Sequence, residues 1–210
     1  MPDLKPLREA IISGDAKTAK ATTEAALAAG IEPMKLVQEY MMPAMAEVGH
    51  RFECNEYFVP ELLLAARAMK AALELVRPLL AAGGAKAATR VAVGTVKGDL
   101  HDIGKNLVAA MLEGGGYEVI DLGVNVSPEQ FISSVRDKGA HIVAMSALLT
   151  TTMPAMKTTV EAFKQAGVRA QVKILVGGAP ITQKYADEIG ADGYSETAAG
   201  VVSIAKRALN

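Results

Sequence analysis

The pattern of hydrophobic and polar positions changes once along this chain. Before residue 81 the apolar residues recur at helical spacing, as Leu4, Leu7 and Ile11 do. The same spacing predicts two longer helices, over 34–48 and 60–76. An irregular connection over 50–59 lies between them. Asp15 can cap a further helix and Gly30 can end it, so the four segments together predict a small bundle of four helices.

After residue 89 short β-branched runs alternate with helical stretches. Strands are predicted over 90–96, 117–122, 141–146, 172–176 and 192–194. Helices are predicted over 104–113, 128–138, 154–166, 182–189 and 198–209. The strand runs are apolar without interruption, which suits parallel strands covered on both faces. This half therefore predicts a Rossmann-like, doubly wound parallel sheet of five strands.

A segment of small residues over 81–89 separates the two patterns and has the composition of an interdomain linker. We expect a helical domain over residues 1–88 and an α/β domain over 89–210. Gly83 and Gly84 are the predicted hinge between them.

Composition narrows the class of protein. The 210 residues are 50% hydrophobic and 21% charged, with a net charge of −1. Since no basic patch is present, neither nucleic acid nor a membrane surface is an expected partner. The single cysteine, Cys54, cannot form an internal disulfide, and the charged N-terminus lacks the apolar stretch of a signal peptide. These features predict a cytoplasmic protein.

The expected chemistry lies beyond the carboxyl ends of the strands, where parallel sheets bind ligands. Asp99 and His101 follow the first predicted strand, and Gly104 opens the next helix. A carboxylate that accepts the proton of one ring nitrogen leaves the other nitrogen free to bind a metal. One imidazole cannot build a metal cage, so the metal must bring its other ligands, as haem or a corrin does. The alternative is that Asp99 caps the helix and His101 is a surface loop residue.

Two later motifs favour the metal interpretation. Residues 105–145 separate Gly104 from a Ser146-Ala147-Leu148 motif, and residues 149–176 separate that motif from Gly177-Gly178. This order and spacing of D-x-H-x-x-G, S-x-L and G-G resembles the signature of the cobalamin-binding domain. The family includes methionine synthase and the corrinoid proteins of methanogen and acetogen methyltransferases. The helical half resembles the cap domain of its methyl-carrying members.

The resemblance implies a cobalamin cofactor, cycling between methylcob(III)alamin and cob(I)alamin, whose own base is detached from cobalt. His101 is then the lower cobalt ligand, Asp99 its hydrogen-bonding partner, and Thr152 the third member of a relay. Thr152 stands where methionine synthase has a serine. The cofactor-binding residues that the resemblance implies in the α/β half are Gly98, Asp99, Leu100, His101, Asp102, Ile103, Gly104, Ser146, Leu148, Thr150, Gly177, Gly178 and Ala198.

The implied role of the helical half is to cover the upper face of the corrin. Phe52 and Val59 match the covering positions, and the alternative is that they belong to the core of the bundle.

The implied function is a methyl carrier that is not a complete enzyme by itself. A substrate-specific methyltransferase loads it, and an acceptor methyltransferase unloads it onto a tetrahydrofolate or coenzyme M. A reductive activase is a further candidate partner. The alternatives are a cobalamin-dependent sensor or regulatory module, which would add a DNA-binding domain, and a subunit of an adenosylcobalamin mutase. The residues do not choose among methanol, methylamine, betaine and methoxyaromatic donors.

Overall fold

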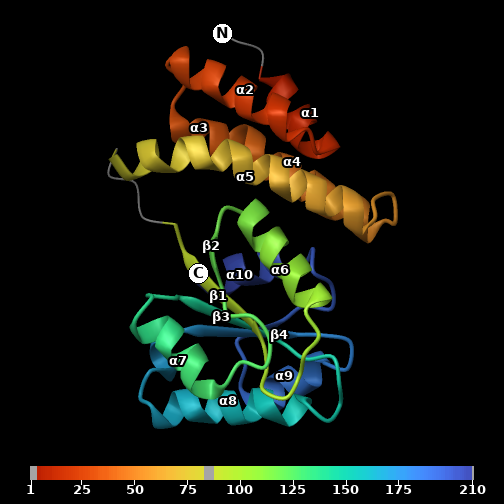
Figure 1. The fold of residues 1–210 in the computed structure, drawn as a ribbon, viewed down its shortest axis with the longest axis vertical. Coiled ribbons are helices and arrows are strands. Elements are labelled where there is room, and N and C mark those ends of the chain that lie inside the picture. Colours follow the sequence, from red (N-terminus) through yellow and green to blue (C-terminus); the bar gives the residue numbers. More distant parts are fainter. Residues whose placement is uncertain (1–3, 83–87, 210) are drawn as a thin grey trace. The chain divides into compact units, whose positions relative to one another are not determined.

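The computed structural model describes residues 4–82 and 88–209. The hinge predicted at Gly83 and Gly84 lies outside the described residues. The chain divides into two compact units, one of Met1–Ala88 with Glu113–Gly116 and one of Thr89–Leu112 with Tyr117–Asn210 (Figure 1). In the described part of the chain, no helix combines the length and apolar character needed to cross a membrane.

The first unit is helical. Its elements are α1 (Lys5–Ser13), α2 (Ala16–Ala28), α3 (Pro33–Leu36), the π-helical turn η1 (Val37–Met41), α4 (Met42–Glu53) and α5 (Val59–Ala82). α1 packs against α2, α4 and α5, and α5 packs against α2 and α4. These contacts enclose a core of large apolar side chains, among them Leu7, Ile11, Leu36, Met41, Leu62 and Met69. The described helices confirm the predicted bundle.

The helix predicted over 34–48 is interrupted by a wide turn. The Met42 N–H bonds to the Val37 carbonyl, which is the i to i−5 pairing of a π-helix. Pro43 follows at the start of α4 and has no N–H to offer. The π-helical turn therefore lets the chain remain helical from α3 into α4.

The irregular connection predicted over 50–59 is wrong at both ends, because α4 continues to Glu53 and α5 starts at Val59. Arg51 explains the extension of α4. Its Nε donates to Glu47 one turn earlier at 2.9 Å, and its guanidinium lies 5.3 Å from the centre of the Tyr57 ring. α5 also continues past Pro78 to Ala82, beyond the predicted end at 76. The lost hydrogen bond at Pro78 kinks or weakens a helix but need not end it.

The second unit is a parallel sheet with strand order β2-β1-β3-β4-β5. Its strands are β1 (Arg90–Thr95), β2 (Glu118–Asp121), β3 (Ile142–Ser146), β4 (Lys173–Gly177) and β5 (Gly193–Tyr194). Its helices are α6 (Ile103–Gly114), α7 (Pro128–Arg136), α8 (Met153–Gln165), the 3₁₀ turn η2 (Arg169–Gln171), α9 (Gln183–Ile189) and α10 (Val201–Leu209). The predicted fold class is confirmed. β2 and β3 lie on opposite sides of β1, so a crevice is expected at the carboxyl ends of β1 and β3.

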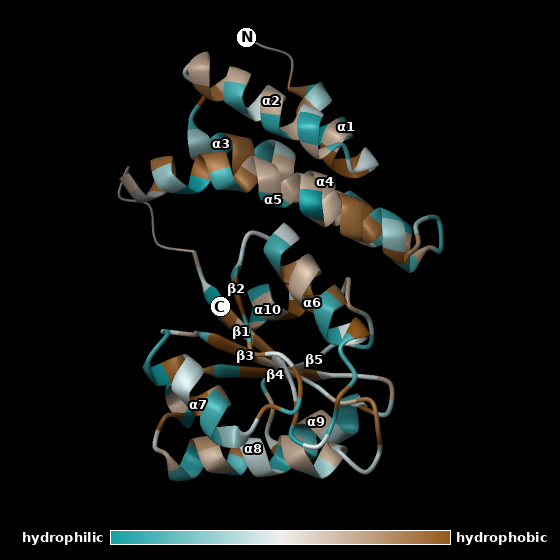
Figure 2. Ribbon diagram, viewed as in Figure 1, coloured by the Kyte–Doolittle hydropathy of each residue, from teal (hydrophilic) through white to brown (hydrophobic). Residues whose placement is uncertain are grey.

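The two faces of the sheet are packed differently. α7, α8 and α9 cover one face, and α6 and α10 lie over the other (Figure 1). The strands themselves are hydrophobic, as Figure 2 shows for β1, β3 and β4. On the first face a large core gathers around Phe131, Met156 and Phe163, all fully buried. On the second face Val93, Ala144 and Leu175 lie side by side in register across β1, β3 and β4.

We predict that Ser127→Ala lowers the free energy of unfolding of the sheet unit by about 1 kcal/mol. Ser127 caps α7 by accepting the Gln130 N–H, while the Gln130 side chain accepts the Ser127 N–H. Urea unfolding followed by circular dichroism measures the change. Ser127→Asp keeps a capping oxygen and should remain within a few tenths of a kcal/mol of the parent. Equal loss in both variants would contradict the capping role.

Candidate functional site

The Asp99 carboxylate is fully buried at the carboxyl end of β1. Its Oδ1 accepts hydrogen bonds from the His101 backbone N–H at 3.1 Å and from the imidazole Nδ1 at 2.7 Å. Its Oδ2 accepts from the backbone N–H groups of Leu148 at 2.8 Å and Leu149 at 3.4 Å. The Thr152 hydroxyl donates to the same oxygen at 2.7 Å. One side chain therefore joins the loop after β1 to the loop after β3.

These hydrogen bonds set the charge of Asp99. Burial opposes ionisation, but the hydrogen bonds from Thr152, Leu148 and His101 outweigh it and hold the pKa of the Asp99 carboxyl below its usual range. The carboxylate is thus ionised at neutral pH and can only accept, so the His101 Nδ1 carries the proton. Nε2 is left as the atom that can bind a metal. The His101 side chain is 50% exposed, which makes that atom accessible.

The Thr152 hydroxyl has two acceptors within reach, Asp99 at 2.7 Å and the Leu149 carbonyl at 2.9 Å. A hydroxyl has one proton and can donate it to one of them at a time. The charge on Asp99 favours the carboxylate, since hydrogen bonds to ionised groups are the stronger ones.

Two residues outside the sequence motif fix the loop that carries His101. The buried Thr95 hydroxyl donates to the His101 carbonyl at 2.8 Å. Asn125 accepts the Gly98 N–H on its side chain at 2.8 Å and donates its own N–H to the Asp99 carbonyl at 3.0 Å. Sequence reasoning missed both. The signals were a lone hydroxyl in a buried strand and an asparagine suited to the left-handed conformation, with φ +54°.

Large apolar side chains surround this loop and remain exposed. Leu100 is 71% exposed and Ile103 78% exposed, and Leu148 and Leu149 on the loop after β3 are also exposed. Proteins seldom leave several neighbouring apolar side chains in water unless they bind something. The two loops that Asp99 joins thus present an accessible imidazole with apolar side chains on both.

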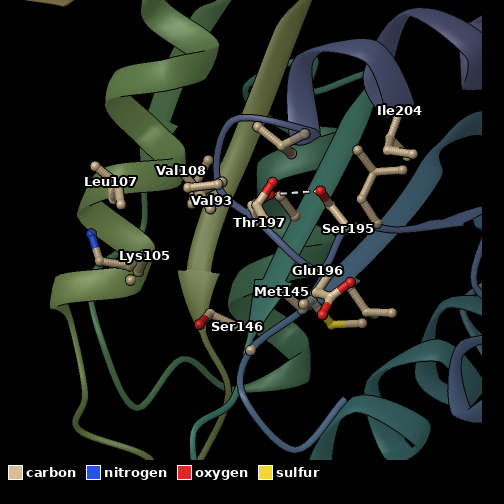
Figure 3. A pocket seen from close by; sticks show the side chains of 18 of the residues that line it. Val93, Lys105, Leu107, Val108, Met145, Ser146, Ser195, Glu196, Thr197 and Ile204 are labelled. Carbon is tan, nitrogen blue, oxygen red and sulfur yellow. Dashed lines mark hydrogen bonds between the residues drawn. The ribbon is translucent and has the colours of Figure 1, made fainter. Parts of the chain in front are cut away.

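A slot of about 300 Å³ runs into the sheet unit beside this loop. Figure 3 shows it between α6, which carries Lys105, Leu107 and Val108, and the segment that carries Ser195 and Thr197. Its floor is the sheet. Gly178, at φ +127°, lies at its edge, and a Cβ there would overlap the Ala147 carbonyl oxygen. Glycine is therefore required for the loops after β3 and β4 to approach each other.

Comparison with known proteins decides the family. The model of the B12 binding domain matches residues 89–203, and a second B12 binding domain model matches residues 4–77. The chain belongs to the family of B12-binding corrinoid proteins. It is 43% identical to the trimethylamine corrinoid protein of Methanosarcina barkeri over 97% of this chain and 94% of that protein. The cofactor of this B12-binding protein is a cobalamin.

Two solved structures share the fold. One is a cobalamin-binding protein from Desulfitobacterium hafniense DCB-2, with a TM-score of 0.81 and 31% identity over 99% of both chains. The other belongs to the methanol:cobalamin methyltransferase complex MtaBC of Methanosarcina barkeri. The TM-score there is 0.80 with 30% identity, over 96% of this chain and 77% of that one.

The residues of this B12-binding protein fit a cobalamin. A single accessible imidazole nitrogen suits a metal whose remaining ligands come largely from a macrocycle. The exposed apolar side chains of the two loops suit the flat face of such a ring. The slot beside them has the dimensions of a binding cavity for an appended group rather than of a packing defect.

The structure places the predicted cofactor residues in two groups. Gly104, Ser146, Gly177, Gly178 and Ala198 line the slot. The loop between β1 and α6 contains Gly98, Asp99, Leu100 and Asp102 beside His101, and Ile103 is the first residue of α6. Leu148 contributes its N–H to Asp99.

Three predicted residues are outside these groups. The structure does not bring Thr150 to the slot, because its side chain is exposed in the loop beyond β3 and is not among the lining residues. Phe52 and Val59 belong to the helical unit. Phe52 is half-buried in α4, and Val59 is exposed at the start of α5.

Lys105 is a further slot residue that the sequence motif did not reveal. Its side chain is only 2% exposed, and its ammonium lies 2.7 Å from both carboxylate oxygens of Asp121 and 2.6 Å from the Asn106 side-chain oxygen. Burial works against the charge of Asp121, but the bond from Lys105 keeps the pKa of that carboxyl below its usual value. The pair ties α6 to the end of β2 along one wall of the slot.

We predict that Thr152→Val lowers the free energy of unfolding at neutral pH by about 1.5–3 kcal/mol, the range for a hydrogen bond to a charged group. The buried Asp99 carboxylate would lose its hydroxyl donor while keeping its charge. Thr152→Ser retains that donor and should lose less than half as much. Chemical denaturation of the cofactor-free protein measures both. If serine and valine cost the same, the hydroxyl is not supporting Asp99.

Proposed function

We propose that this protein is a corrinoid methyl carrier, with residues 1–88 as the cap domain and 89–210 as the cobalamin-binding domain. The cobalt of bound cobalamin accepts a methyl group from one methyltransferase and gives it to another. The observation that carries the proposal is the accessible His101 imidazole, held by a buried and ionised Asp99. That geometry fits a lower cobalt ligand in place of the cofactor's own base.

In this proposal Asp99 determines which nitrogen of His101 carries the proton and which is free to bind the metal. Asp99 holds the proton on His101 Nδ1, so that Nε2 is a neutral donor. An Nε2 without a metal bond would be open to a proton, and the imidazolium so formed would stay paired with Asp99 through Nδ1. Binding of the metal and protonation of Nε2 therefore exclude each other. The Thr152 hydroxyl stabilises the ionised carboxylate in both conditions.

The helical unit presents an apolar face that suits a cover for the other side of the ring. Phe58, just before α5, and Val59 and Leu63, one turn apart on it, are all exposed, and we name them the α5 apolar face. Phe52 is half-buried in the preceding helix. Sequence reasoning selected Phe52 and Val59 but missed Phe58 and Leu63. An apolar cover excludes water and oxidants from a reactive centre.

The proposed methyl donor is a methylamine. Support comes from the 43% identity to a trimethylamine corrinoid protein and the 41% identity to a dimethylamine corrinoid protein of Methanosarcina barkeri. The protein of the methanol system shares the fold at 30% identity. That structure is a complex with a methyltransferase, which supports a substrate-specific methyltransferase as the first partner here. We further propose an acceptor methyltransferase using a tetrahydrofolate or coenzyme M, a reductive activase, and a cytoplasmic location.

The function is tested by reconstituting the full chain with hydroxo- and methylcobalamin. We predict the absorption spectrum of a cobalamin whose base is detached and whose lower ligand is a histidine. His101→Ala should lose that spectrum and bind cobalamin at least about tenfold more weakly, since one metal ligand is gone. His141→Ala is the control, because His141 Nδ1 accepts the Arg90 backbone N–H at 3.3 Å at the start of β1, away from the carboxyl ends of the strands where His101 lies. A normal spectrum in His101→Ala would contradict the ligand assignment.

The second stage of this test measures methyl transfer. After reduction, the protein is incubated with methyltransferases specific for trimethylamine, dimethylamine or methanol and their substrates. Methylation from a methylamine and not from methanol is expected. Methylation from methanol alone would overturn the proposed donor while leaving the carrier function in place.

We predict that Leu63→Ser leaves folding nearly unchanged, because the side chain is exposed, but shortens the lifetime of the reduced cofactor under trace oxygen several-fold. Leu79→Ser is the matched control. Leu79 is an exposed leucine on the same helix, about 24 Å further along it. Oxidation followed by absorbance compares the two. Equal lifetimes would show that the α5 apolar face does not cover the cofactor.

A further inference from the structure

The floor of the slot is partly polar near the strand ends and apolar further in. Residues that pair in register across neighbouring strands form a row of the floor. Alternate residues of one strand share a face, so successive rows of the floor are two residues apart. Ser146 and Gly177 pair across β3 and β4 and form the outer row, nearest the strand ends. Two residues earlier Val93, Ala144 and Leu175 pair across β1, β3 and β4 and form the inner row.

The inner end is apolar on its walls as well. Val108 on α6, and Val201 and Ile204 on α10, line it together with the inner row. The polar groups that border the inner end already have partners: Asp121, which pairs with Val93 across β1 and β2, binds Lys105, and the Thr197 hydroxyl oxygen accepts the Gly200 N–H at 3.1 Å. Glu196 and Thr197 are exposed, and the Ser195 hydroxyl is already engaged with the Thr197 carbonyl at 2.6 Å (Figure 3). The Lys105 ammonium is saturated by Asp121 and Asn106.

Small residues in the floor keep this inner end open. Ala144 is the central residue of the inner row, and its methyl group leaves the space that a larger side chain would fill. Gly193, the next residue across on β5, lies against α10, because a Cβ there would come within 2.5 Å of Ile204. α10 is therefore held close to the sheet at β5, while the small side chain of Ala144 leaves space above the middle of the floor.

We propose that the inner row selects the corrinoid by its terminal base, favouring an apolar benzimidazole over a purine. This inference rests on the proposed function, in which the detached nucleotide tail enters the slot. The base is the last group of that tail and so reaches furthest in. A benzimidazole presents a six-membered ring of carbon atoms, whereas adenine presents ring nitrogens and an amino group. At the inner row those polar atoms lose water and find no partner.

The experiment compares the affinity of the full chain for three corrinoids: cobalamin, a corrinoid with adenine as its base, and cobinamide, which lacks the nucleotide. Equilibrium ultrafiltration with detection by absorbance gives each Kd. We expect cobalamin to bind about tenfold to a hundredfold more tightly than the adenine corrinoid, the effect of one or two unpaired buried polar atoms. Cobinamide should bind more weakly than cobalamin as well.

Each other outcome has a defined meaning. Equal affinity for cobalamin and the adenine corrinoid overturns the selectivity and leaves the carrier function standing. Cobinamide binding as tightly as cobalamin shows that the slot takes no tail, which also overturns the inference. If none of the three binds, the proposed function itself fails.

A pair of valine-to-threonine variants locates the selectivity. Val93→Thr puts a hydroxyl in the inner row and should narrow the ratio between the two corrinoids several-fold. Val143→Thr is the matched control, because Val143 is a buried valine on the adjacent strand that faces the core under α7 and α8. It should leave the ratio unchanged. Ala144→Ser adds a smaller hydroxyl to the same row and gives the test if Val93→Thr fails to fold. An unchanged ratio in a folded inner-row variant overturns the assignment.

Discussion

The burial of one charged side chain organises the site. An isolated carboxylate without water would cost several kcal/mol, so the fold can hold Asp99 only if its oxygens are supplied with donors. Five donors do so, and they come from the loops after β1 and β3. Since those strands are neighbours in the sheet, correct strand order is itself a condition for the orientation of His101. The ligand geometry is thus a consequence of the fold rather than an addition to it.

The two faces of the sheet differ in role: one packs the hydrophobic core and the other carries the binding slot. The face under α7, α8 and α9 carries the dense core around Phe131 and Phe163. The opposite face carries the slot. A void of this size is destabilising in a packed interior, because its lining atoms lack contact partners. The first face offsets that cost, and a ligand that fills the slot restores the missing contacts. We infer that a cofactor bound in the slot raises the free energy of unfolding of the sheet unit.

Sequence patterns predicted the parallel sheet and the positions of its strands because a strand covered on both faces must be apolar over most of its length, as 142–145 are. The resemblance to the cobalamin-binding signature singled out Asp99, His101 and Thr152, and the structure joins their side chains by hydrogen bonds, while their roles toward cobalt stay a prediction. Sequence patterns failed at 50–59 and at Pro78, where contacts of Arg51 and the packing of α5 override local signals. Asn125 and Lys105 were missed because their partners, Gly98 and Asp121, are 27 and 16 residues away in the sequence. Thr95 was missed because a lone hydroxyl in a buried strand does not show that it donates to the His101 carbonyl.

The inner row of the slot discriminates among ligands because its side chains offer no hydrogen-bond donor or acceptor. A site that recognises a polar ligand must place donors and acceptors accurately, and a small displacement weakens it. A site that rejects polar ligands needs only to remove water and offer no partner, which Val93, Ala144 and Leu175 do from three adjacent strands. Such selectivity tolerates small movements of α6 and α10, because no single contact carries it. In a carrier that must hold its cofactor while meeting successive partners, discrimination of this kind rests on hydrogen-bonded neighbouring strands of the sheet.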